Sequence, residues 1–145
     1  MFKSGVTFGW SIWIIPDNYE WFREKYRIEH IPHITIQSRI INPLSSHIGK
    51  TYKFQFERGF HLLPVWNPKD KGFRSWAWYC KVNGLDIPHA HMSIQYFDEL
   101  DKGYDRRGRN IYPPKGEFTG TAHLVDTRSH IPSEWKIVKN LNEHL

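Results

Sequence analysis

The chain has 145 residues, which suits one domain with a hydrophobic core, and we expect a single domain over residues 1–145. Lys and Arg number 20 against 15 Asp and Glu, and the formal charge of +5 favours anionic partners. The single cysteine, Cys80, excludes an internal disulfide and so a disulfide-stapled scaffold. No apolar run approaches the roughly 18 residues of a membrane span, and none has the pattern of a signal peptide. We therefore expect a cytoplasmic protein without a membrane partner, and nothing indicates an obligate protein partner.

The first expected element is a strand over residues 6–15, rich in β-branched and aromatic residues and ended by Pro16. A helix is expected over residues 17–27, because Asp17 can act as N-cap and Glu20 as its capping-box partner. Its buried stripe would consist of aromatic residues spaced three and four apart, Tyr19, Phe22 and Tyr26.

The remainder of the chain predicts mostly strands. Alternating or continuous apolar runs place them over residues 31–41, 51–56, 60–66, 76–82, 90–97, 117–125 and 134–138. Asn83 and Gly84 predict a tight turn, and the polar segment 98–114 predicts a long loop. One helix among many strands predicts the α+β class, with antiparallel sheets and few helices.

A short internal repeat is the most informative feature. The pentad His33-Ile34-Thr35-Ile36-Gln37 matches His91-Met92-Ser93-Ile94-Gln95, since both contain histidine, an apolar residue, a hydroxyl residue, isoleucine and glutamine in that order. Of nine histidines, only His33 and His91 are followed two residues later by Ser or Thr. Because side chains alternate along a strand, the histidine, hydroxyl and glutamine of each pentad are expected on one face.

A histidine beside a hydroxyl suits phosphate chemistry. Imidazole titrates at a pKa of about 6.5, so it can hold or release a proton near neutral pH. Two histidines on opposite sides of one phosphodiester can supply the base for the attacking hydroxyl and the acid for the leaving oxygen. A neighbouring hydroxyl can donate a hydrogen bond to a non-bridging oxygen, where charge develops in the transition state.

These two motifs resemble those of the two-histidine (2H) phosphoesterase superfamily, which carries two His-x-Thr/Ser motifs on strands of a bilobal α+β fold. The resemblance implies that His33 and His91 are acid and base, that Thr35 and Ser93 bind the scissile phosphate, and that the site lies in a cleft between the lobes. It also implies that no metal or other cofactor is needed. The one departure is serine in place of threonine in the second motif, which the family tolerates.

The substrate expected from this resemblance is a nucleotide phosphodiester. The chain is similar in size and aromatic content to compact viral and phage members, including anti-CBASS phosphodiesterases, which would place it in the host cytoplasm. Those members degrade cyclic oligonucleotide signals at a 3′–5′ bond, through a 2′,3′-cyclic phosphate. Other members cleave 2′–5′ oligoadenylate or open 2′,3′-cyclic phosphates, and these substrates remain alternatives.

Such a substrate needs partners for its bases and for its other phosphates. Tryptophan rings can stack on bases, and long cations can bind the phosphates. The expected substrate-binding residues are Trp10, Trp66, Trp76, Arg74 and Arg109. For each tryptophan, a place in the core is the competing interpretation.

Two other functions are compatible with parts of the sequence. His89 and His91 would share a strand face and could ligate zinc or iron, with a third ligand from His123, His130 or Glu134. A basic, aromatic nucleic-acid-binding module without catalysis is the alternative from another class. It would not require the two histidine–hydroxyl pairs, so their repetition favours an enzyme.

Overall fold

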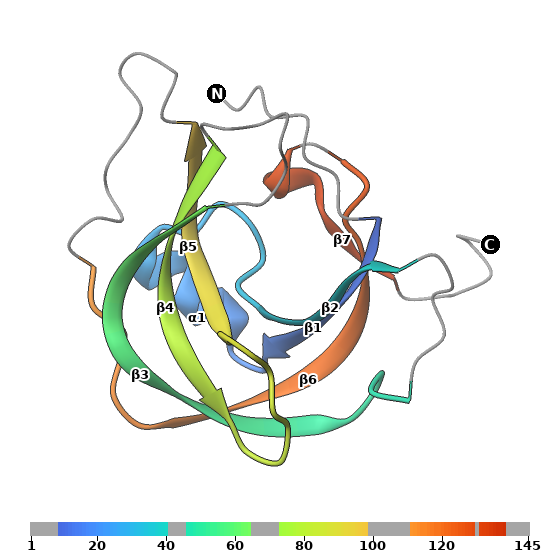
Figure 1. Ribbon diagram of the computed structural model, residues 1–145, viewed down its shortest axis with the longest axis horizontal. Coiled ribbons are helices and arrows are strands. Elements are labelled where there is room, and N and C mark those ends of the chain that lie inside the picture. The colour runs from blue at the N-terminus through green and yellow to red at the C-terminus, as the bar shows by residue number, and fades with distance from the viewer. Residues whose placement is uncertain (1–8, 41–45, 65–72, 99–110, 130, 139–145) are drawn as a thin grey trace.

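The computed structural model describes residues 9–40, 46–64, 73–98, 111–129 and 131–138 (Figure 1). The chain order of its elements is β1 (Trp10–Pro16), α1 (Tyr19–Tyr26), β2 (Ile34–Ile40), β3 (Thr51–Pro64), β4 (Phe73–Val82), β5 (His91–Asp98), β6 (Glu117–Asp126), the 3-10 helix η2 (Pro132–Glu134) and β7 (Lys136–Ile137). One helix and many antiparallel strands confirm the α+β class with few helices.

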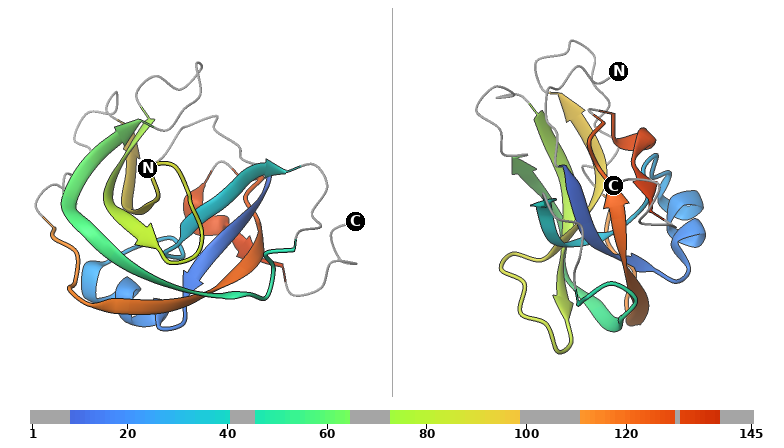
Figure 2. Two further views of the ribbon diagram at one scale, coloured as in Figure 1. Left: turned by 60° about the horizontal axis from the view of Figure 1, so that its bottom comes forward. Right: turned by 90° about the vertical axis from the view of Figure 1, so that its right-hand side faces the viewer.

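All these strands form one antiparallel sheet in the order β1-β2-β5-β4-β3-β6-β7, and β1 also pairs with β6. This extra pairing runs from Trp10–Asp126 to Pro16–Gly120, so the sheet closes on itself (Figure 1). Glycine is required at position 120 of this ladder, because a Cβ there would lie 2.8 Å from the Ile15 carbonyl oxygen. Figure 2 shows α1 lying across one end of the closed sheet, where the fully buried Phe22 enters the core.

A row of fully buried side chains crosses four strands and fixes their register. Ile14 of β1 pairs with Ile34, Ile34 pairs with Met92, and Met92 pairs with Trp78 of β4. All four side chains are 0% exposed. Because neighbouring side chains in a strand point to opposite faces, this inward row turns the motif histidines and hydroxyls to the other face.

Several expected boundaries differ from the structure. The two strands predicted over residues 51–56 and 60–66 are one strand, β3, with a register irregularity between Phe56 and Phe60. The last predicted strand is reduced to the two residues of β7, because η2 occupies the positions before it. The first motif strand begins only at Ile34, so His33 is the residue directly before β2.

The predicted capping box is wrong. Asn18 is the N-cap of α1, and its side chain makes no capping hydrogen bond. The Asp17 carboxylate instead accepts a hydrogen bond from the Thr121 hydroxyl at 3.1 Å, and the Asp17 amide donates to the Thr119 carbonyl at 2.9 Å. Asp17, which the local sequence pattern predicts to cap the helix, is therefore hydrogen-bonded to β6 instead. In the described parts of the chain, no helix combines the length and apolar character that crossing a bilayer requires.

Candidate active site

The two repeated pentads lie on neighbouring strands. Ile34 of β2 pairs with Met92 of β5 in the antiparallel direction. Continued by one residue on either side, that register would set His33 opposite Ser93 and Thr35 opposite His91, with the two histidines diagonal to each other. Diagonal neighbours of this kind have Cα atoms about 7–8 Å apart.

Both motif histidines make the same hydrogen bond. His33 Nδ1 lies 2.6 Å from the carbonyl oxygen of Ile31, and His91 Nδ1 lies 3.0 Å from the carbonyl oxygen of His89. A carbonyl oxygen can only accept, so each Nδ1 carries the proton and donates it two residues back. In the neutral imidazole each Nε2 is therefore an unprotonated acceptor, the form that a general base needs.

The second of these bonds depends on an unusual backbone conformation. His89 has φ of 55°, in the left-handed region that non-glycine residues rarely occupy. This conformation lies just before β5 and breaks the strand alternation. The expectation that His89 and His91 project from one strand face is therefore wrong, since His89 precedes the strand.

Burial lowers the pKa of both motif histidines. His33 is 4% exposed, and its pKa is held well below the usual value first by desolvation, then by the nearby His30 and His91, against the opposing hydrogen bond to Ile31. The pKa of His91 is lowered mainly by burial, while the His89 hydrogen bond opposes the shift. The unliganded site thus favours neutral imidazoles.

The Ser93 hydroxyl belongs to a small buried polar cluster. It donates a 3.0 Å hydrogen bond to the Ser75 hydroxyl of β4. Burial raises the pKa of Tyr96 to about 12, and a side-chain hydrogen bond to Ser93 opposes that shift. Thr35 is half-buried and pairs with Trp13 of β1. Both expected hydroxyls therefore lie on the strand pair that carries the histidines.

Three residues at this site were not predicted from the sequence. The Trp13 ring lies parallel to the His33 ring at 3.4 Å, and Trp135 meets His33 edge-on at 6.2 Å. His30 donates from Nε2 to the Ser93 carbonyl at 2.8 Å, and burial lowers its pKa to about 4. His30 thus joins the segment before the first motif to the second motif. A histidine close to the first motif was visible in the sequence, but its long-range partner was not.

A β-bulge follows the hydroxyl residue in both pentads. Trp13 pairs with Thr35 and Ile12 with Gln37, so Ile36 is an extra residue in β2. In β5 the extra residue is Ile94, because Ala77 pairs with Ser93 and Trp76 with Gln95. One inserted residue reverses the alternation beyond it. The prediction that each glutamine shares a face with its histidine is therefore wrong. The two pentads also share the position of their β-bulge, so they match in backbone geometry as well as in sequence.

Of the expected substrate-binding residues, the three that the structure describes have other partners than the two histidines. Trp10 pairs with Ile40 at the far end of β2, and the Arg128 guanidinium lies 4.9 Å from its ring centroid. Trp76 packs against the main core and stacks on Phe97 at 6.0 Å. Arg74 lies on β4 opposite Phe97. Trp66 and Arg109 lie outside the described residues.

The described residues do not support the metal-binding alternative. Among them, no three His, Cys, Asp or Glu side chains gather closely enough to hold an ion. Of the possible third ligands, His123 lies on β6 and Glu134 in η2, while His130 is outside the described residues.

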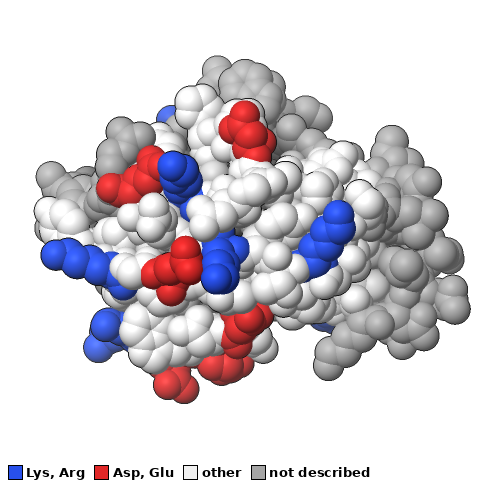
Figure 3. All heavy atoms as spheres, turned by 90° about the horizontal axis from the view of Figure 1, so that it is seen from below, with Lys and Arg blue, Asp and Glu red and all other residues white. Residues whose placement is uncertain are grey.

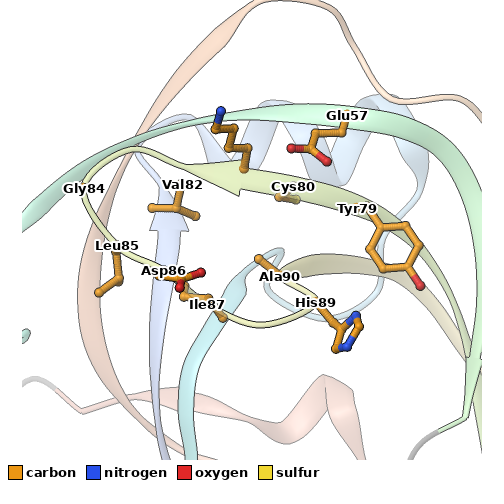
Figure 4. Close-up of a pocket in the computed structure, with 11 residues that line it drawn as sticks. Glu57, Tyr79, Cys80, Val82, Gly84, Leu85, Asp86, Ile87, His89 and Ala90 are labelled. Atoms are coloured by element: carbon orange, nitrogen blue, oxygen red, sulfur yellow. The ribbon is translucent and has the colours of Figure 1, made fainter.

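A pocket of about 680 Å³ adjoins the second motif (Figure 4). It lies where the connection 83–90 joins β4 to β5. Its walls come from β3, β4 and that connection: Glu57, Tyr79, Cys80, Lys81, Val82, Gly84, Leu85, Asp86, Ile87, His89 and Ala90. This volume falls within the range of small-molecule sites.

Comparisons of the chain with protein-family models, with curated proteins and with solved structures find no match.

Proposed function

We propose that this protein is a metal-independent phosphodiesterase that cleaves a nucleotide phosphodiester with His33 and His91 as acid and base. The observation that carries the proposal is the matched hydrogen bonding of the two histidines. Each donates from Nδ1 to the carbonyl two residues before it, which leaves both Nε2 atoms for proton transfer. Each motif also supplies a hydroxyl, from Thr35 or Ser93, on adjacent strands.

The catalytic step needs one neutral and one protonated imidazole. We assign the base of the bond-breaking step to His33, since it is more deeply buried than His91 and burial favours the neutral imidazole. His91 then donates its proton to the leaving oxygen. A bound phosphate anion favours the required imidazolium, because an opposite charge within a few ångströms raises a histidine pKa. Thr35 donates to a non-bridging oxygen as its charge grows, and Ser93 does the same once its hydroxyl rotates away from Ser75.

His33 is buried, so a substrate can reach it only if the segment that carries Trp135 moves. The Trp135 ring meets His33 edge-on and is itself 5% exposed. Its indole N–H donates to the Ser129 carbonyl at 3.0 Å, and the following strand β7 is only two residues long. The β7 ladder and the hydrogen bond from the Val138 amide to the Leu124 carbonyl anchor the chain after Trp135, so we propose that η2 and Trp135 swing aside from that anchor when substrate enters.

The bilobal arrangement expected from the family resemblance is part of the same proposal. The closed sheet would act as two lobes, one led by β2 and one by β5, with the phosphate in the cleft between them. Because Ile34 pairs directly with Met92, such a cleft would run along the outer seam between β2 and β5.

The proposed substrate is a cyclic oligonucleotide signal of antiviral defence, cut at a 3′–5′ bond through a 2′,3′-cyclic phosphate. The neighbouring 2′-hydroxyl would attack the phosphorus while its proton passes to His33, and the 5′-oxygen would leave with a proton from His91. The alternatives are 2′–5′ oligoadenylate and 2′,3′-cyclic nucleotides. All three classes present a phosphodiester to the two histidines, although water is the attacking group when a 2′,3′-cyclic nucleotide is opened.

Incubation with a substrate panel tests the proposal. The panel contains cyclic dinucleotides, cyclic trinucleotides, 2′–5′ oligoadenylate and 2′,3′-cyclic nucleotides, and products are identified by chromatography and mass spectrometry. Turnover of at least one class by the wild type, lost in His33→Ala and His91→Ala, supports the proposal. A panel that stays intact with folded protein contradicts it.

The competing function is nucleic-acid binding without catalysis. It requires a surface on which positive charge gathers. On the face shown in Figure 3, Lys and Arg side chains are interspersed with Asp and Glu. Among the described residues on that face, positive charge therefore does not gather into one patch, as a general polyanion binder would require.

A further inference from the structure

We propose that the pocket beside His91 binds the nucleoside attached to the scissile phosphate, with its base deep in the pocket and its phosphate toward the histidine. This inference rests on the proposed function and adds a substrate subsite to it. It also predicts a preference for bases that carry an exocyclic amino group, namely adenine, guanine and cytosine, over uracil.

The pocket and the second motif share a boundary. His89 and Ala90 line the pocket and directly precede His91 in the chain. Tyr79 also lines it and is the register partner of His91 across β4 and β5, so the two side chains share a sheet face. Figure 4 shows Tyr79 and His89 at one end of the pocket, with Gly84 and Leu85 at the other. A ligand held at His91 would therefore extend toward Leu85.

The lining matches the parts of a nucleoside. Tyr79 offers an aromatic ring, the kind of side chain on which bases stack. Val82, Leu85 and Ile87 provide apolar contacts along the wall. The carboxylates of Glu57 and Asp86 accept hydrogen bonds and donate none when ionised, so they select groups that donate, such as ribose hydroxyls and amino groups of bases.

Charge fixes the direction in which the nucleoside enters. Two carboxylates and one ammonium, that of Lys81, line the pocket, and this balance disfavours a phosphate inside it. The phosphate is favoured outside the pocket, next to the imidazole of His91. The base, which is uncharged, is the part that can lie beside Asp86 and the apolar wall, while Figure 4 shows Glu57 nearer the Tyr79 end, where ribose hydroxyls can donate to it.

Binding of nucleoside 3′-monophosphates tests the inference without any turnover. Titration calorimetry with adenosine, guanosine, cytidine and uridine 3′-monophosphates should give weaker binding for the uridine compound by about 10-fold. Tyr79→Ala should weaken all four by about 5- to 150-fold, because each loses the ring on which its base stacks. Asp86→Asn should reduce the difference between adenosine and uridine compounds.

Matched controls come from outside the pocket. Tyr112→Ala removes an exposed tyrosine, and Glu20→Gln removes a carboxylate of α1; neither should change binding. Equal affinity for all four compounds, or binding untouched by Tyr79→Ala, overturns the inference. If the substrate panel is cleaved but Tyr79→Ala leaves KM unchanged, the subsite is wrong and the catalytic proposal stands. If the compounds bind as predicted but no phosphodiester is cleaved, the pocket is supported and the catalytic proposal fails.

Discussion

The imidazole of His33 lies flat against the indole of Trp13, with ring centroids 3.4 Å apart and planes inclined by 6°. Trp13 is itself 2% exposed and packs edge-on against Trp135. The indole therefore fixes one face of the imidazole, while the Nδ1 bond to Ile31 fixes its rotation.

Replacing Trp13 tests whether this stacking positions a catalytic base. Trp13→Phe retains an aromatic face and should keep kcat within about 10-fold, because contacts that position a base act through geometry. Trp13→Leu removes the ring and should lower kcat by about 100-fold, the loss typical of a misplaced catalytic group. Steady-state kinetics on the cleaved panel member measure both effects.

The control for lost packing is Ile15→Ala. Ile15 lies on the same strand, in the same buried cluster as Trp13, and is 3% exposed. This change should cost about 2–5 kcal/mol of stability and leave kcat near the wild-type value at temperatures where the protein is folded. Equal losses of kcat in Trp13→Leu and Ile15→Ala would mean that Trp13 acts only through stability.

The sequence pattern predicted the motif strands because their local chemistry is self-consistent. The apolar residues Ile34 and Met92 bury one face of each strand, and that requirement alone turns the motif side chains the other way. The α+β class followed from one helical period among many alternating runs. Neither inference required knowledge of which strands pair.

Features that depend on pairing were not predictable. The bulges at Ile36 and Ile94 exist only relative to β1 and β4, so the sequence could not show that Gln37 and Gln95 turn away from the histidines. The contacts of Trp13, His30 and Trp135 with the motifs join distant segments. Tryptophan abundance alone therefore suggested Trp10 and Trp76 as ligand residues, where the structure places them in packing contacts.

Removal of either motif histidine should abolish most of the activity. His33→Ala and His91→Ala should each lower the rate about 10²–10⁴-fold, the usual contribution of one general acid or base. Single-turnover assays on the cleaved panel member measure the loss. His47→Ala is the control, because His47 bonds to Tyr52 Oη, outside the two motifs, and should retain activity. Near-normal turnover in either motif variant would remove that histidine from the mechanism.

A matched pair of variants separates the catalytic effect of the Ser93 hydroxyl from the effect of its hydrogen bond on stability. Ser93→Ala and Ser75→Ala both delete the same buried hydrogen bond, so each should cost about 0.5–1.5 kcal/mol of stability. Only Ser93→Ala also removes the proposed phosphate donor, and it should lower kcat about 10²–10³-fold. Denaturant unfolding and kcat together measure the two effects. Equal kcat in the two variants would exclude Ser93 as a donor to the transition state.

Thr35→Val offers the same separation in the first motif. Valine keeps the branched shape of the threonine side chain and removes its hydroxyl. Thr35 is half-buried, so the fold should tolerate the change, while kcat should fall about 10²–10³-fold. A variant with unchanged kcat would leave only the second motif with a hydroxyl role.

Activity should survive a chelator. The proposed steps use only imidazoles and hydroxyls, so EDTA followed by dialysis should leave kcat unchanged. The measurement is turnover before and after treatment, with metal content checked by mass spectrometry. Complete loss with EDTA, restored by zinc or manganese, would favour a metal site that includes His89 or His91.

The buried neutral histidines predict that the protein loses stability in mild acid. His30 has a folded-state pKa of about 4, and that of His33 is also depressed, against about 6.5 in the unfolded chain. Between these values the unfolded state binds more protons than the folded state. The free energy of unfolding therefore falls as pH decreases from about 6.5 toward 4, by up to about 1.4 kcal/mol per pH unit for each histidine. Denaturant unfolding at a series of pH values measures this slope.

His30→Gln tests how much of this pH dependence of the free energy of unfolding comes from His30. Glutamine cannot titrate but can still donate to the Ser93 carbonyl, so the slope between pH 4 and 6.5 should decrease by about one proton's worth, roughly 1.4 kcal/mol per pH unit. At pH 8 both forms of His30 are neutral, and the difference between variant and wild type there gives the cost of packing and hydrogen bonding alone. If the variant and the wild type lose stability in parallel from pH 8 to pH 4, then His30 is not held neutral in the folded protein.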